Sequence, residues 1–273
     1  MSVEKGGDVL KTEHALKINL SLNVSFILEP IRSPGGGLLA MEILSRFHVN
    51  GEKSHVTFPP DSILRKVTPD EKKKLFLRQL DILGGQEQFF TKNNVLCSLN
   101  IDVCLAEFIC NTPDIKKKLI NMPFVRFEIS EMFPEMNNVT RNPLLANLSR
   151  DFGLWLDDFG SGYANMSAVQ SGLFEAVKID KAFFWKHVAS PLWPSILREI
   201  RRDVTSVIIE GVETEIQREQ LLDSVEGLQG HLFPPVPLSE PEAALTLLGS
   251  VRPSTGMLAS IVSLRQLSAR HST

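Results

Sequence analysis

The stretch LWLDDFGSGYANMSA, from Leu154 to Ala168, joins an apolar run to two adjacent aspartates and a glycine-rich segment. The apolar residues up to Leu156 predict a buried strand, and the glycines favour a sharp turn directly after it. Asp157 and Asp158 at the end of such a strand are costly to bury unless a cation lies between them. We therefore expect a strand end that holds metal ions, in a fold that brings further ligands to the same place.

The bulk properties of the chain fit one large domain. The chain has 273 residues, of which 43% are hydrophobic, and its 29 basic and 32 acidic side chains give a net charge of −3. This length suits a single barrel, since barrels of about 250 residues commonly form one domain. The small negative charge argues against a protein that binds nucleic-acid polymers, which usually carries a basic excess. It does not exclude a nucleotide that is held through a metal ion.

The cysteines and the N-terminal region indicate a cytoplasmic protein. Cys97, Cys104 and Cys110 lack the spacing of a zinc site and predict reduced thiols. The first fifteen residues contain no apolar segment typical of a signal peptide, and no apolar run is long enough for a membrane helix. We therefore expect a cytoplasmic location and no contact with a membrane.

Short apolar runs with the length of strands recur along the chain, and helix-length segments separate most of them. The predicted strands are Leu22–Ile31, Leu38–Arg46, Val95–Ile101, Val125–Ile129, Leu154–Phe159, Ala176–Ile179, Ser206–Val212 and Leu228–Leu232. Eight strands alternating with helices predict an α/β fold, a modified (β/α)8 TIM-type barrel, with a doubly wound open sheet as the rival. The first two strands are joined only by Arg32–Gly37, which is too short for a helical crossover. We therefore expect an antiparallel hairpin there, and hence one antiparallel strand in the barrel.

Two helix starts are marked by their sequence. Pro69 is followed by two acidic residues, which favour the first turn of a helix. Thr214 precedes Gln217 by three residues and predicts a capping box. The segments Pro191–Arg202 and Ser239–Leu248 also predict helices.

Polar side chains stand at or near the C-terminal end of most predicted strands. In a parallel barrel these ends meet at one mouth, where the chemistry occurs. The set comprises Glu42, Arg46, Asn100, Glu128, Glu131, Asp157, Asp158, Lys178, Asp180, Glu210, Glu213 and Gln229. Carboxylates that converge on one mouth need compensating charge, and divalent cations with oxygen ligands supply it. The sequence therefore predicts a two-metal site, of the kind that clamps the attacking and leaving oxygens of a phosphoryl transfer.

Each of these residues also has a simpler structural interpretation. Glu42 alone would more often face solvent or join a buried ion pair, and Asn100 alone would cap a turn. Lys178 could extend along the surface, and Asp158 could cap the turn before the glycines. Because these residues occur at successive strand ends, one shared functional site explains them better than a separate structural role for each.

Seven segments of the chain resemble the motifs of EAL domains, in the same order. They are MEILSRF (Met41–Phe47), SLNID (Ser98–Asp102), FEISE (Phe127–Glu131), LDDFGSGYA (Leu156–Ala164), VKIDKAFF (Val177–Phe184), IIEGVET (Ile208–Thr214) and LQGHLF (Leu228–Phe233). The resemblance spans roughly Leu22 to Leu248. It implies an N-terminal extension over residues 1–20, an EAL phosphodiesterase domain over residues 21–250 and a C-terminal tail over residues 251–273.

EAL phosphodiesterases hydrolyse cyclic di-GMP to linear pGpG with Mg²⁺ or Mn²⁺, and the resemblance implies the same reaction here. The implied metal ligands, for two ions per site, are Glu42, Asn100, Glu128, Asp157, Asp158 and Glu210. The implied catalytic group comprises Glu42, Lys178, Glu210, Glu131 and Gln229. In it Lys178 orients the attacking water or helps to deprotonate it, Gln229 completes the water network and Glu131 braces the loop after Asp158. The implied substrate-binding residues are Arg46, which contacts a phosphate, together with Leu44, Asn100, Asp180 and Glu213.

The chain departs from the family pattern at two positions near the site. Glu29 in LEPI stands where members usually carry Gln, which bears on base recognition. The segment FPPVP (Phe233–Pro237) lacks the usual Arg before Pro, which bears on the closing loop of the barrel. Neither departure removes a metal ligand, so we predict an active enzyme.

Two other functions stay open at this point. Some stand-alone EAL domains have lost catalysis and act as ligand- or protein-binding regulators, and another nucleotide phosphodiester could be the substrate. The resemblance also implies a homodimer, and control of motility, fimbriae or biofilm as the cellular output.

Overall fold

The structure is a computed structural model that describes residues 22–49, 57–58, 60–162 and 166–246. The predicted N-terminal extension and C-terminal tail therefore lie outside the described residues. In the described part of the chain, no helix is long and apolar enough to cross a membrane.

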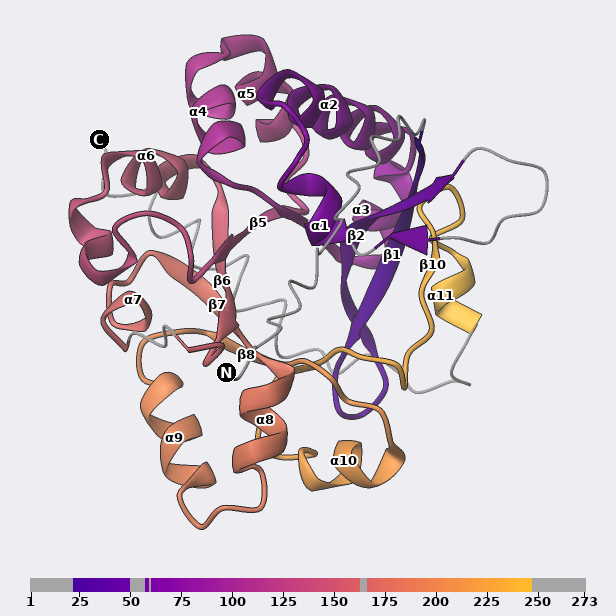
Figure 1. Cartoon of the computed structure of the whole chain (residues 1–273). Helices are drawn as coiled ribbons and strands as arrows, with labels where there is room; N and C mark the ends of the chain where they lie inside the picture. Colours follow the sequence, from indigo (N-terminus) through magenta and orange to yellow (C-terminus); the bar gives the residue numbers. More distant parts are fainter. Residues whose placement is uncertain (1–21, 50–56, 59, 163–165, 247–273) are drawn as a thin grey trace, which may run out of the picture.

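Eight strands form the closed barrel that the sequence predicts, with helices around it (Figure 1). The barrel strands are β1 (Leu22–Arg32), β2 (Leu38–Val49), β4 (Leu96–Asn100), β5 (Val125–Ser130), β6 (Gly153–Phe159), β7 (Phe174–Ile179), β8 (Ser206–Ile209) and β9 (Gly227–Leu228). Two further strands, β3 (Thr57–Phe58) and β10 (Val236–Pro237), extend the sheet beside β2 and β1. The barrel closes because β1 pairs with both β2 and β9.

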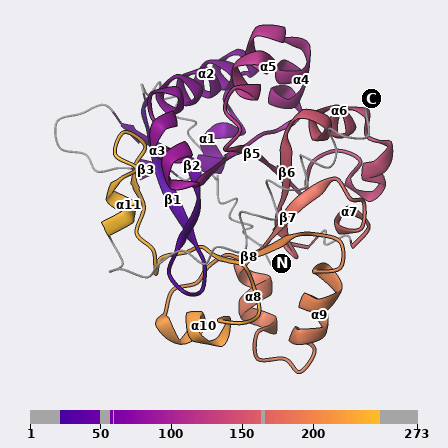
Figure 2. The same ribbon diagram turned by 180° about the vertical axis from the view of Figure 1, so that it is seen from behind.

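Helices surround the strands in the two opposite views of Figures 1 and 2. They are α1 (Pro60–Leu64), α2 (Pro69–Gly85), α3 (Glu87–Asn93), α4 (Val103–Asn111), α5 (Pro113–Ile120), the 3-10 helix η1 (Met136–Arg141), α6 (Pro143–Asp151), α7 (Met166–Val169), α8 (Lys181–His187), α9 (Trp193–Ile200), α10 (Glu215–Gln220) and α11 (Ala243–Thr246). Both predicted starts are confirmed, because Thr68 caps α2 directly before Pro69 and Thr214 forms a capping box with Gln217 at α10.

Strand β1 is the one antiparallel member of the barrel, as the short connection to β2 predicts. It runs antiparallel to β2 and β9, whereas the pairs from β2 through β9 around the rest of the barrel are parallel. The β1–β2 pairing extends from Leu22 opposite Val49 down to the hairpin turn, but β4 pairs with β2 only along Ala40–Ile43. The outer half of the hairpin therefore continues beyond the wall that the neighbouring strand forms.

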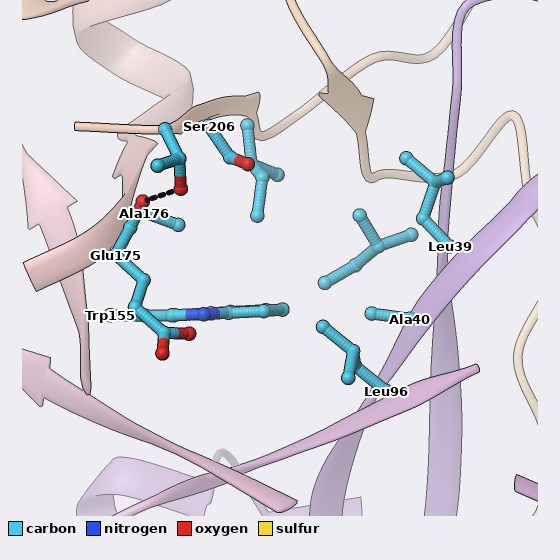
Figure 3. A pocket seen from close by; sticks show the side chains of 10 residues that line it. Leu39, Ala40, Leu96, Trp155, Glu175, Ala176 and Ser206 are labelled. Atoms are coloured by element: carbon cyan, nitrogen blue, oxygen red, sulfur yellow. Dashed lines mark hydrogen bonds between the residues drawn. The ribbon is translucent and has the colours of Figure 1, made fainter. Parts of the chain in front are cut away.

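Side chains that point into the barrel form two layers. The lower layer is apolar and includes Ala40, Trp155, Ala176 and Ile208, which form a hydrophobic cluster of their own. Figure 3 shows Trp155 extending across this end of the barrel toward Ala40 and Leu96. The cavity that remains there has a volume of only about 20 Å³, roughly the space of one water. Because side chains alternate along a strand, the next inward residue lies two positions further on, and these residues form the site.

The structure differs from the predicted elements near the C-terminal end. Strand β9 is shorter than the predicted strand Leu228–Leu232 and ends at Leu228, and helix α11 begins at Ala243, later than the predicted start at Ser239. The glycine conformations explain the early end of β9. Gly211 and Gly230 have φ values of 70° and 146°, and a side chain at position 230 would collide with the backbone of Val212. The chain therefore turns where the apolar pattern suggested a continuing strand.

Candidate functional site

The upper inward layer of the barrel carries the predicted site residues. Glu42 is on β2, Asn100 on β4, Glu128 on β5, Asp157 on β6 and Lys178 on β7, while Glu210 and Gln229 follow β8 and β9 directly. Glu42, Glu128, Lys178 and Gln229 are buried, whereas Asn100 is exposed at the mouth. Seven strands thus bring to one place residues that lie far apart in the sequence.

Lys178 is the centre of this cluster. Its ammonium nitrogen lies 2.8 Å from Glu210 Oε1, 2.9 Å from Glu128 Oε2, and 3.0 Å from both Glu42 Oε2 and Asp157 Oδ1. Only 1% of the lysine side chain is exposed, so the surface interpretation of this residue is wrong. Burial opposes its charge, but the four carboxylates outweigh burial and raise the pKa of Lys178 well above its ordinary value. Lys178 is therefore a permanently charged, internal partner of the acids.

Glu42 is held by amide groups as well as by Lys178. Asn100 Nδ2 donates a hydrogen bond to Glu42 Oε1 at 2.5 Å, and Gln229 Nε2 donates to Glu42 Oε2 at 2.7 Å. Burial favours the neutral acid, but the charge of Lys178 and these donated hydrogen bonds lower the pKa of Glu42. Glu42 is therefore the acid of this cluster whose pKa is lowered, which favours its ionised form.

The other acids are short of positive charge. Burial, followed by repulsion from Glu42, raises the pKa of Glu128 well above its ordinary value, and burial also raises the pKa of Asp157. The pKa of Asp158 is raised to about 6 and that of Glu210 to about 8, in both cases mainly by burial and also by the charge of Asp157. One lysine therefore does not neutralise this group of carboxylates, and additional cations would stabilise it.

A sharp turn places the two neighbouring aspartates. Asp158 adopts a left-handed backbone conformation with φ of 58°, and Gly160 follows with φ of 99°. Glu131 accepts hydrogen bonds from Gly160 N and from Ser161 Oγ, both at 3.3 Å, and so braces the turn from β5. These hydrogen bonds fit the role that the family resemblance implies for Glu131. The remainder of the motif, at positions 163–165, lies outside the described residues.

The chemistry of the site fits divalent metal ions. Ligand oxygens of Asp157, Asp158 and Glu210 lie within 4.8 Å of one another. Among the described residues, Glu128 Oε1 and Gln229 Oε1 are buried oxygens without a hydrogen-bond partner. Carboxylate and amide oxygens are the ligands that Mg²⁺ and Mn²⁺ prefer, and the acids here lack compensating charge. These residues could therefore hold metal ions, although the identity of the ion stays a prediction.

The site opens into a cavity of about 630 Å³, within the range typical of small-molecule sites. One wall consists of residues of the acidic cluster together with Glu29, Leu44 and Glu213. A second wall comes from α1 and the residue after it, from α2 and from the start of α4, and includes Arg65, Lys72, Leu75, Phe76, Gln79 and Leu105. The sequence alone does not indicate this second wall, because an amphipathic pattern places Phe76 in the core without showing which cavity the core borders.

Three of the predicted substrate-binding residues are engaged elsewhere. Asp180 caps α8 by accepting hydrogen bonds from Ala182 N and Phe183 N, and it does not line the cavity. Glu213 pairs with Lys181 at 2.8 Å. Arg46 pairs with Glu29 at 2.9 Å. Contacts of these three residues with a substrate therefore stay predictions.

Comparisons with known proteins agree with this architecture. Over 216 residues the chain is 27% identical to the anti-FlhC(2)FlhD(4) factor YdiV of Salmonella typhimurium, a match that covers 77% of this chain and 90% of that protein. The crystal structure of the EAL-like domain protein YdiV superposes with a TM-score of 0.74 at 26% identity, over 82% of this chain and 96% of that one.

A second solved structure shows the same fold at lower identity. The complex of the PaMucR phosphodiesterase with c-di-GMP has a TM-score of 0.60 and 21% identity, over 78% of this chain and 92% of that one. Residues 14–235 match the family model of the EAL domain. The match covers most of the chain, and the motifs that it contains form one cluster at the mouth of the barrel. This chain belongs to the EAL domain family.

Proposed function

We propose that this protein hydrolyses cyclic di-GMP to linear pGpG in a metal-dependent reaction, as a cytoplasmic homodimer. One observation carries the proposal. Carboxylates from β2, β5 and β6, the carboxylate that follows β8 and the amide of Asn100 gather at the mouth of a cavity of about 630 Å³. This set is complete with respect to the metal ligands that the family motif implies. A chain that only retained the fold would have no need for so many uncompensated buried acids.

The proposed metal ligands are the residues with the least compensated oxygens. Glu42, Asn100, Glu128 and Asp157 would hold one ion, and Asp157, Asp158 and Glu210 would hold the other. When bound, Mg²⁺ or Mn²⁺ supplies positive charge that favours ionisation of a water and offsets the charge of the phosphodiester.

The side chains of the chain divide the remaining tasks. Lys178 keeps its proton, since its pKa is raised, so its role is to orient the attacking water and the acids rather than to act as a general base. Gln229 fixes the Glu42 carboxylate through its hydrogen bond. Glu131 maintains the turn that positions Asp158. The guanidinium of Arg46 would donate hydrogen bonds to two oxygens of a phosphate.

The first test is hydrolysis of cyclic di-GMP by the purified protein with Mg²⁺, with pGpG followed by chromatography. We expect turnover by the native protein and a loss of at least about 100-fold in Glu42→Gln, because even residues that only support metal ligands contribute 10–100-fold. Glu199→Gln is the matched control. It removes one carboxylate from an exposed ion pair with Arg202 on α9 and should leave the rate unchanged.

Two results would contradict the proposal. One is ordinary turnover by Glu42→Gln, and the other is no turnover by the folded native protein with Mg²⁺ or Mn²⁺. Calcium should occupy the site and support the reaction poorly, since it is larger and coordinates more flexibly. Good turnover of a different nucleotide phosphodiester, together with weak binding of cyclic di-GMP, would instead identify another substrate.

A second candidate function is regulation through a protein partner. The match to YdiV, named as an anti-FlhC(2)FlhD(4) factor, favours it. A cellular effect on motility, fimbriae or biofilm that persists unchanged in Glu42→Gln would support this function. Loss of the effect in the same variant would support control through cyclic di-GMP.

A further inference from the structure

The lysines around the cavity are already paired with carboxylates of the chain, whereas the exposed Arg65, which also lines the cavity, has no such partner among the described residues. Lys178 lies among four acids, Lys72 pairs with Asp102, and Lys181 pairs with Glu213. An anionic ligand therefore meets a cavity whose lysines are largely neutralised. The protein must release one of these pairs if such a side chain is to bind a phosphate.

Arg46 and Glu29 form an ion pair that resembles the contact between an arginine and a phosphate. Arg46 Nη2 lies 2.9 Å from Glu29 Oε1, and the two side chains are 30% and 28% exposed, so solvent reaches both. A carboxylate presents two oxygens to a guanidinium, as a phosphodiester does, and the two anions therefore compete for the same fork.

The geometry of the hairpin explains why Glu29 captures this arginine. Glu29 lies directly opposite Glu42, whereas Arg46 is four residues further along β2, opposite Ser25. All four residues share one face of the hairpin, because directly opposed residues of an antiparallel pair do so. The guanidinium must reach back along this face toward the mouth of the barrel to meet Glu29.

Glu29 is also connected to the acidic cluster. Gln229 Nε2 lies 3.3 Å from Glu29 Oε2 and 2.7 Å from Glu42 Oε2, so one amide contacts both carboxylates. Glu29 itself lines the cavity. A phosphate that reached Arg46 would therefore come close to the Glu29 carboxylate and would be repelled by it.

We propose that Glu29 is a specificity-determining residue, which holds Arg46 in an ion pair that an incoming phosphodiester must displace. The cavity then favours ligands that bring enough binding energy from elsewhere, such as metal contacts and bases. It discriminates against small phosphate esters. This inference rests on the proposed function, since it takes cyclic di-GMP as the ligand.

The test is calorimetric binding of cyclic di-GMP in Ca²⁺, with four proteins that form a double-mutant cycle: native, Glu29→Gln, Arg46→Ala and the double variant. Gln is isosteric with Glu and still accepts a hydrogen bond from Arg46, so the fold should be retained. We expect Glu29→Gln to bind about three- to five-fold more tightly, the upper part of the range of an exposed or partly exposed ion pair. In the Arg46→Ala background the same change should have less than about a two-fold effect.

Three results would overturn the inference. They are unchanged or weaker binding by Glu29→Gln, an equal gain with and without Arg46, and no binding by either native protein or Glu29→Gln. The second result would indicate a general effect of charge rather than competition for the guanidinium. Glu199→Gln controls for the loss of one negative charge far from the cavity. Formation of pGpG is measured separately, so a failure of hydrolysis with an intact cycle would count against the proposed function alone.

Discussion

At the scale of single residues, the feature that distinguishes this site is a buried lysine in contact with four carboxylates. A buried ion pair that loses one partner leaves an uncompensated charge, which is among the costliest changes in a protein interior. Lys178 therefore stabilises the fold as well as the site. The raised pKa values of Glu128, Asp157 and Glu210 show that its single charge is still insufficient.

Lys178→Met should lower the free energy of unfolding by about 3–5 kcal/mol, because it leaves the acids without a cation. Urea denaturation in EDTA at mildly alkaline pH measures this, since the acids are then least able to take up protons. Mg²⁺ or Mn²⁺ should restore part of the loss. Lys118→Met is the control, because its ion pair with Asp81 is exposed and such pairs contribute at most about 1 kcal/mol. Equal losses in the two variants would contradict this account of Lys178.

The titration of Glu210 predicts how stability depends on pH. Its folded-state pKa is raised to about 8, so its contribution to stability is fully present below its ordinary value of 4.5 and is lost as the pH rises through about 8. Glu210→Gln imitates the protonated acid at every pH. Without metal, the native protein should therefore lose stability relative to Glu210→Gln between about pH 4.5 and about pH 8. Paired urea titrations across this range measure the difference, and a constant difference would refute the expectation.

At the scale of elements, the turn after β6 and the β1–β2 hairpin position the site. The turn needs glycine for two separate reasons. Gly160 has φ of 99°, which side chains rarely adopt, and a Cβ atom there would lie 2.4 Å from the ring of Phe183. Gly162 has φ of 131°, but no residue of the described part of the chain lies within 4 Å of its Cβ position. Substitutions at these two glycines therefore distinguish the cost of backbone strain, which both share, from the cost of steric contact, which only Gly160 has.

Gly160→Ala should destabilise the protein by about 1–3 kcal/mol more than Gly162→Ala, because only the first adds overpacking against Phe183. Both changes share the cost of a left-handed backbone. Urea denaturation of both variants measures the stability, and Mn²⁺ binding reports whether Asp157 and Asp158 have moved. Equal destabilisation would mean that Phe183 moves aside freely.

Much of the element pattern could be predicted from the sequence, and the exceptions have physical causes. The short Arg32–Gly37 connection correctly predicts the hairpin, and the apolar runs correctly place most strands. The run Leu228–Leu232 misleads because its hydrophobic residues pack beside a glycine-mediated turn, which periodicity does not reveal. The apolar pattern around α10 also predicts that Ile216 and Leu222 are buried, but they are 69% and 47% exposed.

At the scale of the whole molecule, the barrel interior combines an apolar lower layer with an acidic upper layer. Every strand that contributes to the lower layer supplies a polar residue two positions away, as Ala40 and Glu42 do on β2 and Trp155 and Asp157 do on β6. The apolar layer closes the floor of the site and excludes water from below. This packing allows the acids to be buried on one side and open to the cavity on the other.

Trp155→Ala should cost about 3–5 kcal/mol of unfolding free energy, because it leaves a large void beneath the acidic layer. Trp185→Ala provides the comparison, since Trp185 is 44% exposed on α8 and its removal should cost at most about 1–2 kcal/mol. Urea denaturation at a pH where both variants are folded measures the two losses. Similar losses would show that the lower layer adapts by filling the void.

The site itself could be predicted less completely than the fold. The strand-end acids and Lys178 follow from their positions in the motif, and the structure places them together. The pairings Glu29–Arg46 and Lys181–Glu213 could not be predicted, because they depend on how long side chains bend across neighbouring elements. The wall formed by Arg65 and Phe76 depends on how α1 and α2 pack over the mouth, which no local pattern specifies.

The two-residue step between the layers also limits how such a gene can change over time. Deleting or inserting one codon within β6 would turn each later side chain of the strand to the opposite face, so that Asp157 would point toward the helices. Insertions and deletions are therefore tolerated in the connecting loops, whereas inside the strands they disrupt the orientation of the site residues. Descendants of this chain that keep the barrel are therefore expected to change the site residues on its strands by substitution.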